Sequence, residues 1–242
     1  MQYCGQIFSC GASIIDKNHL ITAAHCVDKA EKVFYKVGTN IAPTSTDNMT
    51  EAQCYFVHER WNSEALSNDI AIIRLNEELD FNEPNIGPIC LQSCPCPNSG
   101  ACPTITENTE FVVAGWGVTN VTTGDESDVL METSLHLQDF SVCNNAYGGL
   151  LNCRKHFCVG DVGHSTCMGD SGGPVMQCND GRYNLWGIIS FGDESCAATN
   201  SVNTYVPCYY HWIITKMNEQ CPAKKKSSFK VRKLSVKSKL RK

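Results

Sequence analysis

Three kinds of segment are missing from this 242-residue sequence. No apolar run approaches the roughly 18 residues of a membrane-spanning helix, so we expect a soluble protein. The opening MQYCGQIFSC has neither a basic n-region nor an apolar h-region, so we expect the signal peptide to be absent from this chain. Nothing before the end of the chain has a sustained 3.6-residue period, which favours strands over helices.

Acidic residues are absent from the last stretch of the chain, residues 224–242. This stretch, KKKSSFKVRKLSVKSKLRK, holds ten of the 20 basic residues, so the rest carries ten basic residues against 25 acidic ones, a net charge of −15. Such a composition predicts a disordered tail that attracts polyanions. The alternatives are a solvated tail that rests on its own acidic domain and, at the other extreme, a polyanion-binding protein in which the tail dominates.

Cysteine, in contrast, is abundant, with 16 residues. An even count at this density predicts a disulfide framework and therefore an oxidising compartment, so we expect a secreted, extracellular protein. Two acceptor triplets for N-glycosylation, at Asn48 and Asn120, agree with that compartment. The short spacings in CLQSCPCPNSGAC leave a zinc site as a less favoured alternative for part of the set.

Short apolar or alternating runs separated by turn-forming clusters predict an all-β domain with one core, built as two sheets or a barrel. The runs are SII at 13–15, KVFYKVG at 32–38, DIAIIRL at 69–75, FVVAGWG at 111–117 and LWGIISFG at 185–192. The exception is YYHWIITKMNEQ, in which Tyr209, Ile213 and Met217 share one helical face that could dock on the body. This helix would close the domain near Cys221.

The segment TCMGDSGGP places Ser171 among glycines. A serine hydroxyl needs a base to become a nucleophile, and that base needs a third group to orient it. His25 in LITAAHC and Asp69 in SNDIAIIRL are the candidates. The pattern G-x-S-x-G also fits the nucleophile elbow of α/β-hydrolases, but those chains run serine, acid, histidine, whereas only His211 follows the serine here.

With these segments, residues 8 to 221 resemble the chymotrypsin/trypsin family of serine endopeptidases. The resemblance rests on CGASIIDKNHLITAAHC, NDIAIIRL, VVAGWG, CMGDSGGPV, WGIISFG and the WI of the last helix, all in order. It implies two antiparallel six-stranded β-barrels with the catalytic site between them, followed by a C-terminal α-helix. The protease domain would span 1–223, with the first barrel at about 1–103, the second at about 104–208 and the helix at about 207–220.

The family mechanism implies a role for each motif. Ser171 would attack the scissile carbonyl to form an acyl-enzyme, His25 would accept and return the proton, and Asp69 would orient the imidazole. The backbone N–H groups of Gly169 and Ser171 would form the oxyanion hole. No cofactor and no metal is needed. We expect a monomer that acts on protein or peptide substrates and meets protein inhibitors of proteases.

The resemblance also implies disulfides and a substrate pocket. The implied pairs are Cys10 with Cys26, Cys143 with Cys158, and Cys167 with Cys196, while the other cysteines stay unassigned. The implied pocket residues are Ser165, Ser190, Gly192 and Ser201. Because Ser165 at the base of the pocket is not a carboxylate, a buried lysine or arginine of a substrate would lack a partner. A preference for large apolar or aromatic residues is therefore expected.

One part of the family pattern is absent. In active members a new amino terminus of Ile-Val-Gly-Gly type pairs with the aspartate before the nucleophile, here Asp170, and this chain has no such segment. An unpaired buried carboxylate is costly, so we expect Asp170 to turn outward or find another partner, with the Gly169 amide misplaced. The alternative function is therefore a zymogen-like or non-catalytic homologue that acts as a binding protein.

Overall fold

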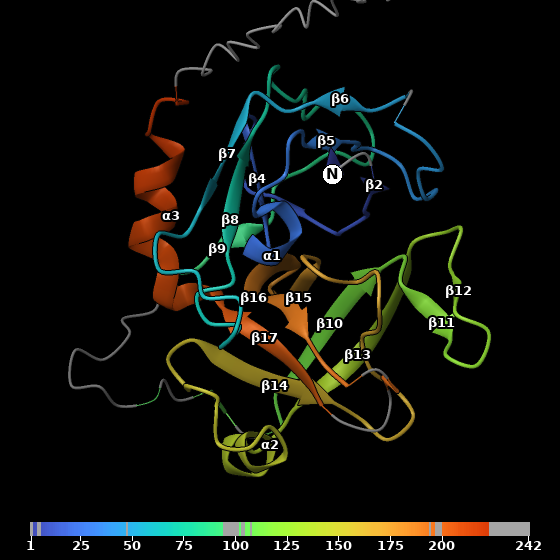
Figure 1. The fold of residues 1–242 in the computed structure, drawn as a ribbon, viewed down its shortest axis with the longest axis vertical. Helices are drawn as coiled ribbons and strands as arrows, with labels where there is room; N and C mark the ends of the chain where they lie inside the picture. Colours follow the sequence, from blue (N-terminus) through green and yellow to red (C-terminus); the bar gives the residue numbers. More distant parts are fainter. Residues whose placement is uncertain are drawn as a thin grey trace, which may run out of the picture.

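Strands dominate the structure, a computed structural model that describes residues 2–3, 6–46, 48–93, 102, 105–106, 108–193, 195–196 and 200–222. The strands form two groups, one from each half of the chain, with helix α3 packed along one side (Figure 1). The basic tail at 224–242 and Cys4, Cys94 and Cys96 lie outside the described residues. No helix in the described ranges has the length and apolar character needed to cross a membrane.

The first group contains a four-stranded antiparallel sheet with the order β3-β4-β8-β7. Its strands are Ser13–Ile14, His19–Thr22, Ala71–Arg74 and Cys54–Val57. Two further strands, β5 (Phe34–Tyr35) and β6 (Thr50–Glu51), pair with each other, and the N–H of Ala52 donates to the carbonyl of Val33 beside them. Ile21, Ile70 and Ile72 are fully buried in this group, as expected of strands that drive core formation.

The second group is a closed barrel. The order β15-β10-β13-β14-β17-β16 returns to its start because β15 also pairs with β16, so that this ring of six strands leaves no free edge. A short strand, β9 (Cys90–Leu91), joins β16 in parallel. The ring strands are Pro174–Asn179, Glu110–Gly115, Met131–Leu137, His156–Gly160, Ser201–Tyr205 and Arg182–Phe191.

Helices are few. α1 (Ala24–Val27) follows β4 directly, and α2 (Phe140–Ala146) begins with Asp139, whose carboxylate accepts from the N–H of Val142. At the end of the described chain, the 3₁₀ helix η1 (Val206–Tyr209) leads into α3 (Tyr210–Met217). The all-β class and the C-terminal helix predicted from the sequence are thus present, with the α-helix itself shorter than the predicted 207–220.

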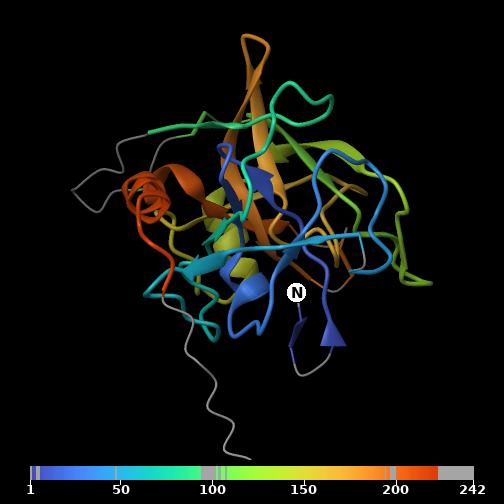
Figure 2. The same cartoon turned by 90° about the horizontal axis from the view of Figure 1, so that it is seen from above.

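Two hairpins project from this framework. β1 (Gln2–Tyr3) pairs with β2 (Gln6–Ile7), and β11 (Val118–Asn120) pairs with β12 (Asp125–Glu126). The β11–β12 hairpin stands out at the side of the molecule opposite α3 (Figure 1), and the view from above shows the same separation (Figure 2). It therefore flanks the region between the two groups of strands.

Candidate active site

His25 and Asp69 meet where the two groups of strands face each other. His25 lies on α1, immediately after β4, and Asp69 precedes β8, which pairs with β4. The backbone N–H of His25 donates to Asp69 Oδ1 at 2.8 Å, and His25 Nδ1 lies 2.7 Å from Asp69 Oδ2. Since an ionised carboxylate only accepts, Nδ1 carries the proton and Nε2 is left as the basic nitrogen.

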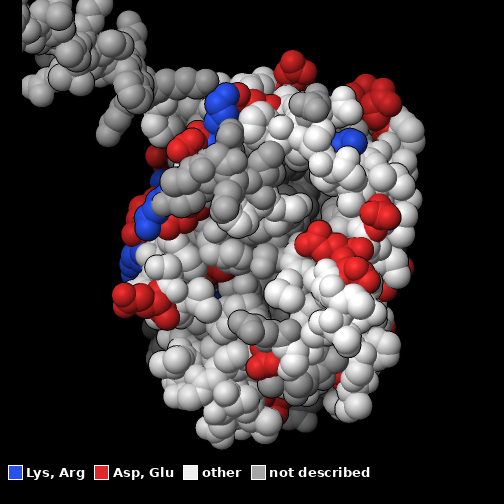
Figure 3. Space-filling view, turned by 45° about the vertical axis from the view of Figure 1, so that its right-hand side comes forward, with Lys and Arg blue, Asp and Glu red and all other residues white. Residues whose placement is uncertain are grey.

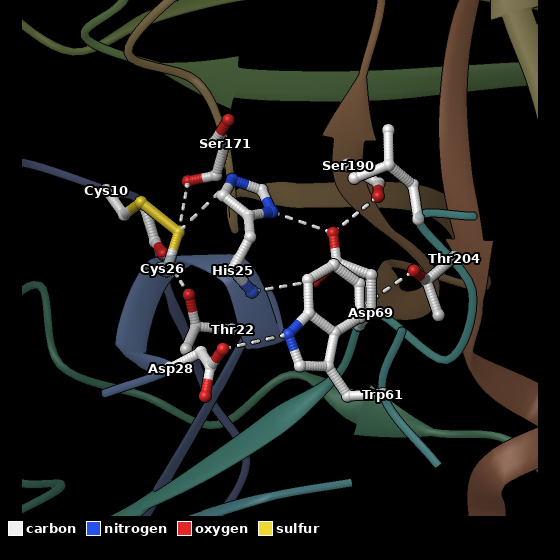
Figure 4. A network of polar contacts seen from close by, with 12 residues as sticks. Cys10, Thr22, His25, Cys26, Asp28, Trp61, Asp69, Ser171, Ser190 and Thr204 are labelled. Atoms are coloured by element: carbon white, nitrogen blue, oxygen red, sulfur yellow. Dashed lines mark hydrogen bonds and ion pairs between the residues drawn. A yellow bond between two sulfur atoms is a disulfide. The ribbon is translucent and has the colours of Figure 1, made fainter. Parts of the chain in front are cut away.

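Asp69 is completely buried, and its oxygen atoms are well supplied with donors. The hydroxyl of Ser190 donates to Asp69 Oδ2 at 2.5 Å, while Thr204 donates its hydroxyl to the Asp69 backbone carbonyl at 2.8 Å (Figure 4). A buried anion is tolerated when hydrogen bonds replace its hydration. Ser190, predicted as a pocket residue, thus uses its hydroxyl to hold the aspartate, a contact that sequence reasoning missed.

Ser171 lies beside the His25 ring, next to the disulfide of Cys10 and Cys26 (Figure 4). Its backbone carbonyl accepts from the N–H of Gly11 at 2.8 Å, which ties the nucleophile loop to the first group of strands. His25 and Ser171 line the same cavity of about 490 Å³. Within the described part of the chain the two side chains make no hydrogen bond in this conformation, a common state of catalytic pairs without substrate.

The loop around Ser171 requires glycine. Gly169 has φ +95°, and a Cβ there would lie 2.9 Å from Gly117 Cα, while a Cβ on Gly172 would lie 2.2 Å from Thr22 Oγ1. Among the described residues, the N–H groups of Gly169 and Ser171 donate to no backbone or side-chain acceptor. Two unused backbone donors in one tight loop can bind an oxyanion.

Asp170 is turned inward. Its carboxylate accepts from the N–H of Gly117 at 2.8 Å and from the N–H of Cys167 at 2.9 Å. Burial raises the pKa of Asp170, and the two backbone hydrogen bonds oppose that rise. Of the two outcomes expected for this carboxylate, the structure has the second, because it finds other partners. A Cβ on Gly115 would lie 2.0 Å from Asp170 Oδ1, which explains a glycine in VVAGWG that sequence reasoning left without a role.

The predicted pocket residues lie on three segments: the loop before Cys167, the end of β16 and the start of β17. Ser165 is half-buried, and next to it Thr166 donates its hydroxyl to Ser201 Oγ at 2.8 Å. Ser201 in turn donates to Asn203 Oδ1 at 3.2 Å, and both are almost fully buried. Gly192 is open, since a Cβ there would meet nothing within 4 Å. These contacts give the region a polar base of hydroxyl and amide groups and open space beside Gly192, and the carboxylate of Asp170 lines the same cavity as Ser165.

All three disulfides implied by the resemblance are formed: Cys10–Cys26, Cys143–Cys158 and Cys167–Cys196. The structure adds two that the sequence left unassigned, Cys54–Cys221 and Cys102–Cys153, and Cys208 is also disulfide-bonded. Cys90 and Cys178 are free. Because Cys102 is oxidised, it cannot serve as a thiolate in the zinc site considered for 90–102, and the same holds for Cys10 and Cys26 beside His25.

Comparison with known proteins agrees with this architecture. A sequence model of the family described as Trypsin matches residues 1–213. The chain is 32% identical over 214 residues to chymotrypsin-like elastase family member 1 of Canis lupus familiaris, with 85% of this chain and 80% of the relative covered. Chymotrypsin-C of Rattus norvegicus is 32% identical over 227 residues (86% and 78% covered), and trypsin-1 of Astacus astacus is 33% identical over 216 residues (84% and 86% covered). The chain, with its barrel, its disulfides and its buried aspartate–histidine pair, belongs to the trypsin family of serine proteases.

Proposed function

We propose that this protein is a secreted serine endopeptidase. The observation that carries the proposal is the fully buried Asp69 hydrogen-bonded to Nδ1 of His25, a residue that lines the same cavity as Ser171. A protease domain over 1–223 would hold this machinery, and the mature protein would act as a monomer in an oxidising compartment, where its disulfides persist.

In this mechanism Ser171 Oγ attacks the carbonyl carbon of the substrate and its proton passes to His25 Nε2. The tetrahedral oxyanion accepts hydrogen bonds from the N–H groups of Gly169 and Ser171. The imidazolium is stabilised by Asp69 and returns its proton to the leaving amine, which gives an acyl-enzyme. Water, deprotonated by His25, then hydrolyses the ester. The reaction uses protein groups and water only.

For the residue before the scissile bond, we propose a preference for large apolar or aromatic side chains. The half-buried Ser165, the Thr166–Ser201 hydrogen bond and the open Gly192 support this preference, because they offer space and hydroxyl groups. The carboxylate of Asp170, which lines the same cavity, already accepts from the N–H groups of Gly117 and Cys167. A lysine or arginine side chain would be desolvated there without a partner. Protein inhibitors of proteases would enter the same site as pseudo-substrates.

A serine-directed phosphonate tests the proposal. Because such a probe reacts only with an activated hydroxyl, the wild-type chain should become labelled on Ser171, and the Ser171→Ala variant should not. Labelling of a His25→Ala variant at the wild-type rate would contradict the mechanism. A wild-type chain that binds peptides yet resists the probe would instead identify the non-catalytic or zymogen-like alternative, in which Asp170 lacks a new amino terminus as its partner and the oxyanion hole is not formed.

A further inference from the structure

The β11–β12 hairpin is attached directly to the loop that carries the proposed oxyanion hole. The N–H of Val118, the first residue of β11, donates to the carbonyl of Met168 at 2.8 Å. Val118 pairs across the hairpin with Glu126 on β12. This register brings the Glu126 carboxylate to the loop, where its Oε1 lies 3.3 Å from the position that a Cβ on Gly169 would occupy.

The Glu126 carboxylate has no partner of its own in the described part of the chain. It is exposed and forms neither an ion pair nor a hydrogen bond there. Asp125 and Asp128 are close to it in the sequence, which contains no lysine or arginine between Arg74 and Arg154. Figure 3, which brings the side of this hairpin forward, shows several acidic side chains and few basic ones. A cation supplied by another molecule would therefore meet a free acceptor at this position.

The position also decides which part of a substrate would meet Glu126. The side chain before the scissile bond is assigned to the region of Ser165, Gly192 and Ser201. The cavity of about 490 Å³ next to Ser171 contains none of those three residues, but it includes Gly169 and reaches Phe8 and the Cys10–Cys26 disulfide. A substrate chain that follows this cavity past the scissile carbonyl passes Gly169, the residue beside which Glu126 lies. The charged residues in the lining of the cavity, Asp28 and Lys29, form an ion pair with each other at 3.9 Å.

We propose that Glu126 selects substrates that carry a lysine or arginine within the first three residues after the scissile bond. The proposal rests on the proposed protease function. It adds to that function a preference for particular substrate residues after the scissile bond. A single carboxylate at an accessible site gives a moderate preference, so we expect kcat/KM to be about fivefold higher for such a substrate than for its alanine analogue. A glutamate at the same position is disfavoured by repulsion.

The test uses the full chain and three peptides that differ only in lysine, alanine or glutamate at the second position after the bond. In the wild type the order of kcat/KM should be lysine, alanine, glutamate. Glu126→Gln should bring the three values to within about twofold, and Glu126→Lys should reverse the order. Asp128→Asn, which removes the same charge two residues away, is the matched control and should keep the wild-type order.

Two additional readouts separate the possible failures. A substrate with a 4-nitroanilide leaving group has no residue after the bond, so its turnover reports on the reaction centre alone. If the anilide and all peptides resist cleavage, the proposed function fails, and the Kd values of the three peptides for the Ser171→Ala variant then test Glu126 by binding. If cleavage or binding proceeds without preference for lysine, or if Glu126→Gln keeps the preference, the assignment of Glu126 is wrong.

Discussion

At the scale of single residues, Asp69 is a fully buried carboxylate that requires hydrogen-bond donors, and it accepts from His25 and from Ser190. Replacement by asparagine keeps the size but offers His25 an N–H as readily as an oxygen, so that the imidazole can adopt the wrong tautomer. We expect Asp69→Asn to lower kcat by roughly 10⁴-fold. Steady-state kinetics on a peptide substrate measure this loss, and an unchanged near-ultraviolet circular dichroism spectrum would show that the fold is retained. A loss of less than tenfold would contradict the orienting role.

Glu59 gives a prediction for pH. Burial alone raises its pKa, but hydrogen bonds from Lys216, from its own backbone and from Trp212, together with the Lys216 charge, lower the pKa from 4.5 to about 2. A carboxyl whose folded-state pKa is depressed stabilises the fold above its unfolded pKa and loses that contribution as the pH falls. The contribution of Glu59 should therefore be complete above about pH 5 and disappear between about pH 4.5 and 2.

Thermal unfolding measured from pH 2 to pH 7 tests this expectation. Glu59→Gln should unfold at a lower temperature than the wild type at pH 7, and the two curves should converge near pH 2. Because the Glu59 side chain is 57% exposed, solvent screening limits the difference to less than about 1 kcal/mol. Glu64→Gln, on the same loop, is the control and should match the wild type throughout. A constant difference at every pH would exclude the electrostatic explanation.

The sequence motifs located some of these residues and could not locate others. His25, Asp69, Ser171 and Gly169 lie in short segments whose composition predicts their chemistry, and the structure brings them together. Ser190 lies in WGIISFG but was predicted only as a pocket residue and not as a donor to Asp69, and Glu59 lies in no such segment. Their partners are 121 residues away for Ser190 and 153 for Glu59, and no local pattern reports a contact at that separation.

At the scale of elements, the chain segment that follows α3 is held by a disulfide whose pairing the sequence analysis left unassigned. Ile213 is fully buried against the first group of strands, and the Cys54–Cys221 disulfide, with a sequence separation of 167, joins β7 to the segment after the helix. Because a cross-link over a long loop removes more entropy from the unfolded chain, this disulfide should contribute about 4 to 5 kcal/mol.

The double variant Cys54→Ala/Cys221→Ala should therefore lose more stability than Cys143→Ala/Cys158→Ala, whose disulfide has a sequence separation of only 15 and an expected contribution of about 3 kcal/mol. Denaturant unfolding of both variants and of the wild type measures the two losses. If the disulfide with the shorter loop contributed more stability, then strain or packing in the folded state, and not the entropy of the unfolded loop, would determine the contribution of each disulfide.

Hydrophobic patterning found some strands and missed others for a physical reason. The runs at 69–75, 111–117 and 185–192 contain β8 and most of β10 and β16, because the buried side chains of these strands are mainly apolar. β17 (Ser201–Tyr205) is equally buried but reads SVNTY, because Ser201 and Asn203 hydrogen-bond to each other and Thr204 donates its hydroxyl to the backbone carbonyl of Asp69. The run at 32–38 predicted a longer strand than the two residues of β5.

At the scale of the whole molecule, charge is distributed very unevenly. Residues 224–242, which lie outside the described ranges, contain ten basic residues and no acidic ones. Residues 1–223 have a net charge of −15. We propose that the tail binds polyanions, so the chain should bind heparin at low salt and release it as the salt concentration rises. Removal of 224–242 should abolish this binding and keep peptide cleavage. Equal heparin binding by both forms would contradict the proposal, and stronger heparin binding by the wild type at high salt would rule out a purely electrostatic contact.

The composition of the β11–β12 hairpin has a further consequence for its resistance to cleavage by other proteases. Exposed hairpins are the preferred sites of proteolytic nicking. This one projects from the body, yet it belongs to the stretch between Arg74 and Arg154 that contains neither lysine nor arginine. An enzyme that cuts only after lysine or arginine finds no target there, so the loop that presents Glu126 would survive intact in the presence of such proteases.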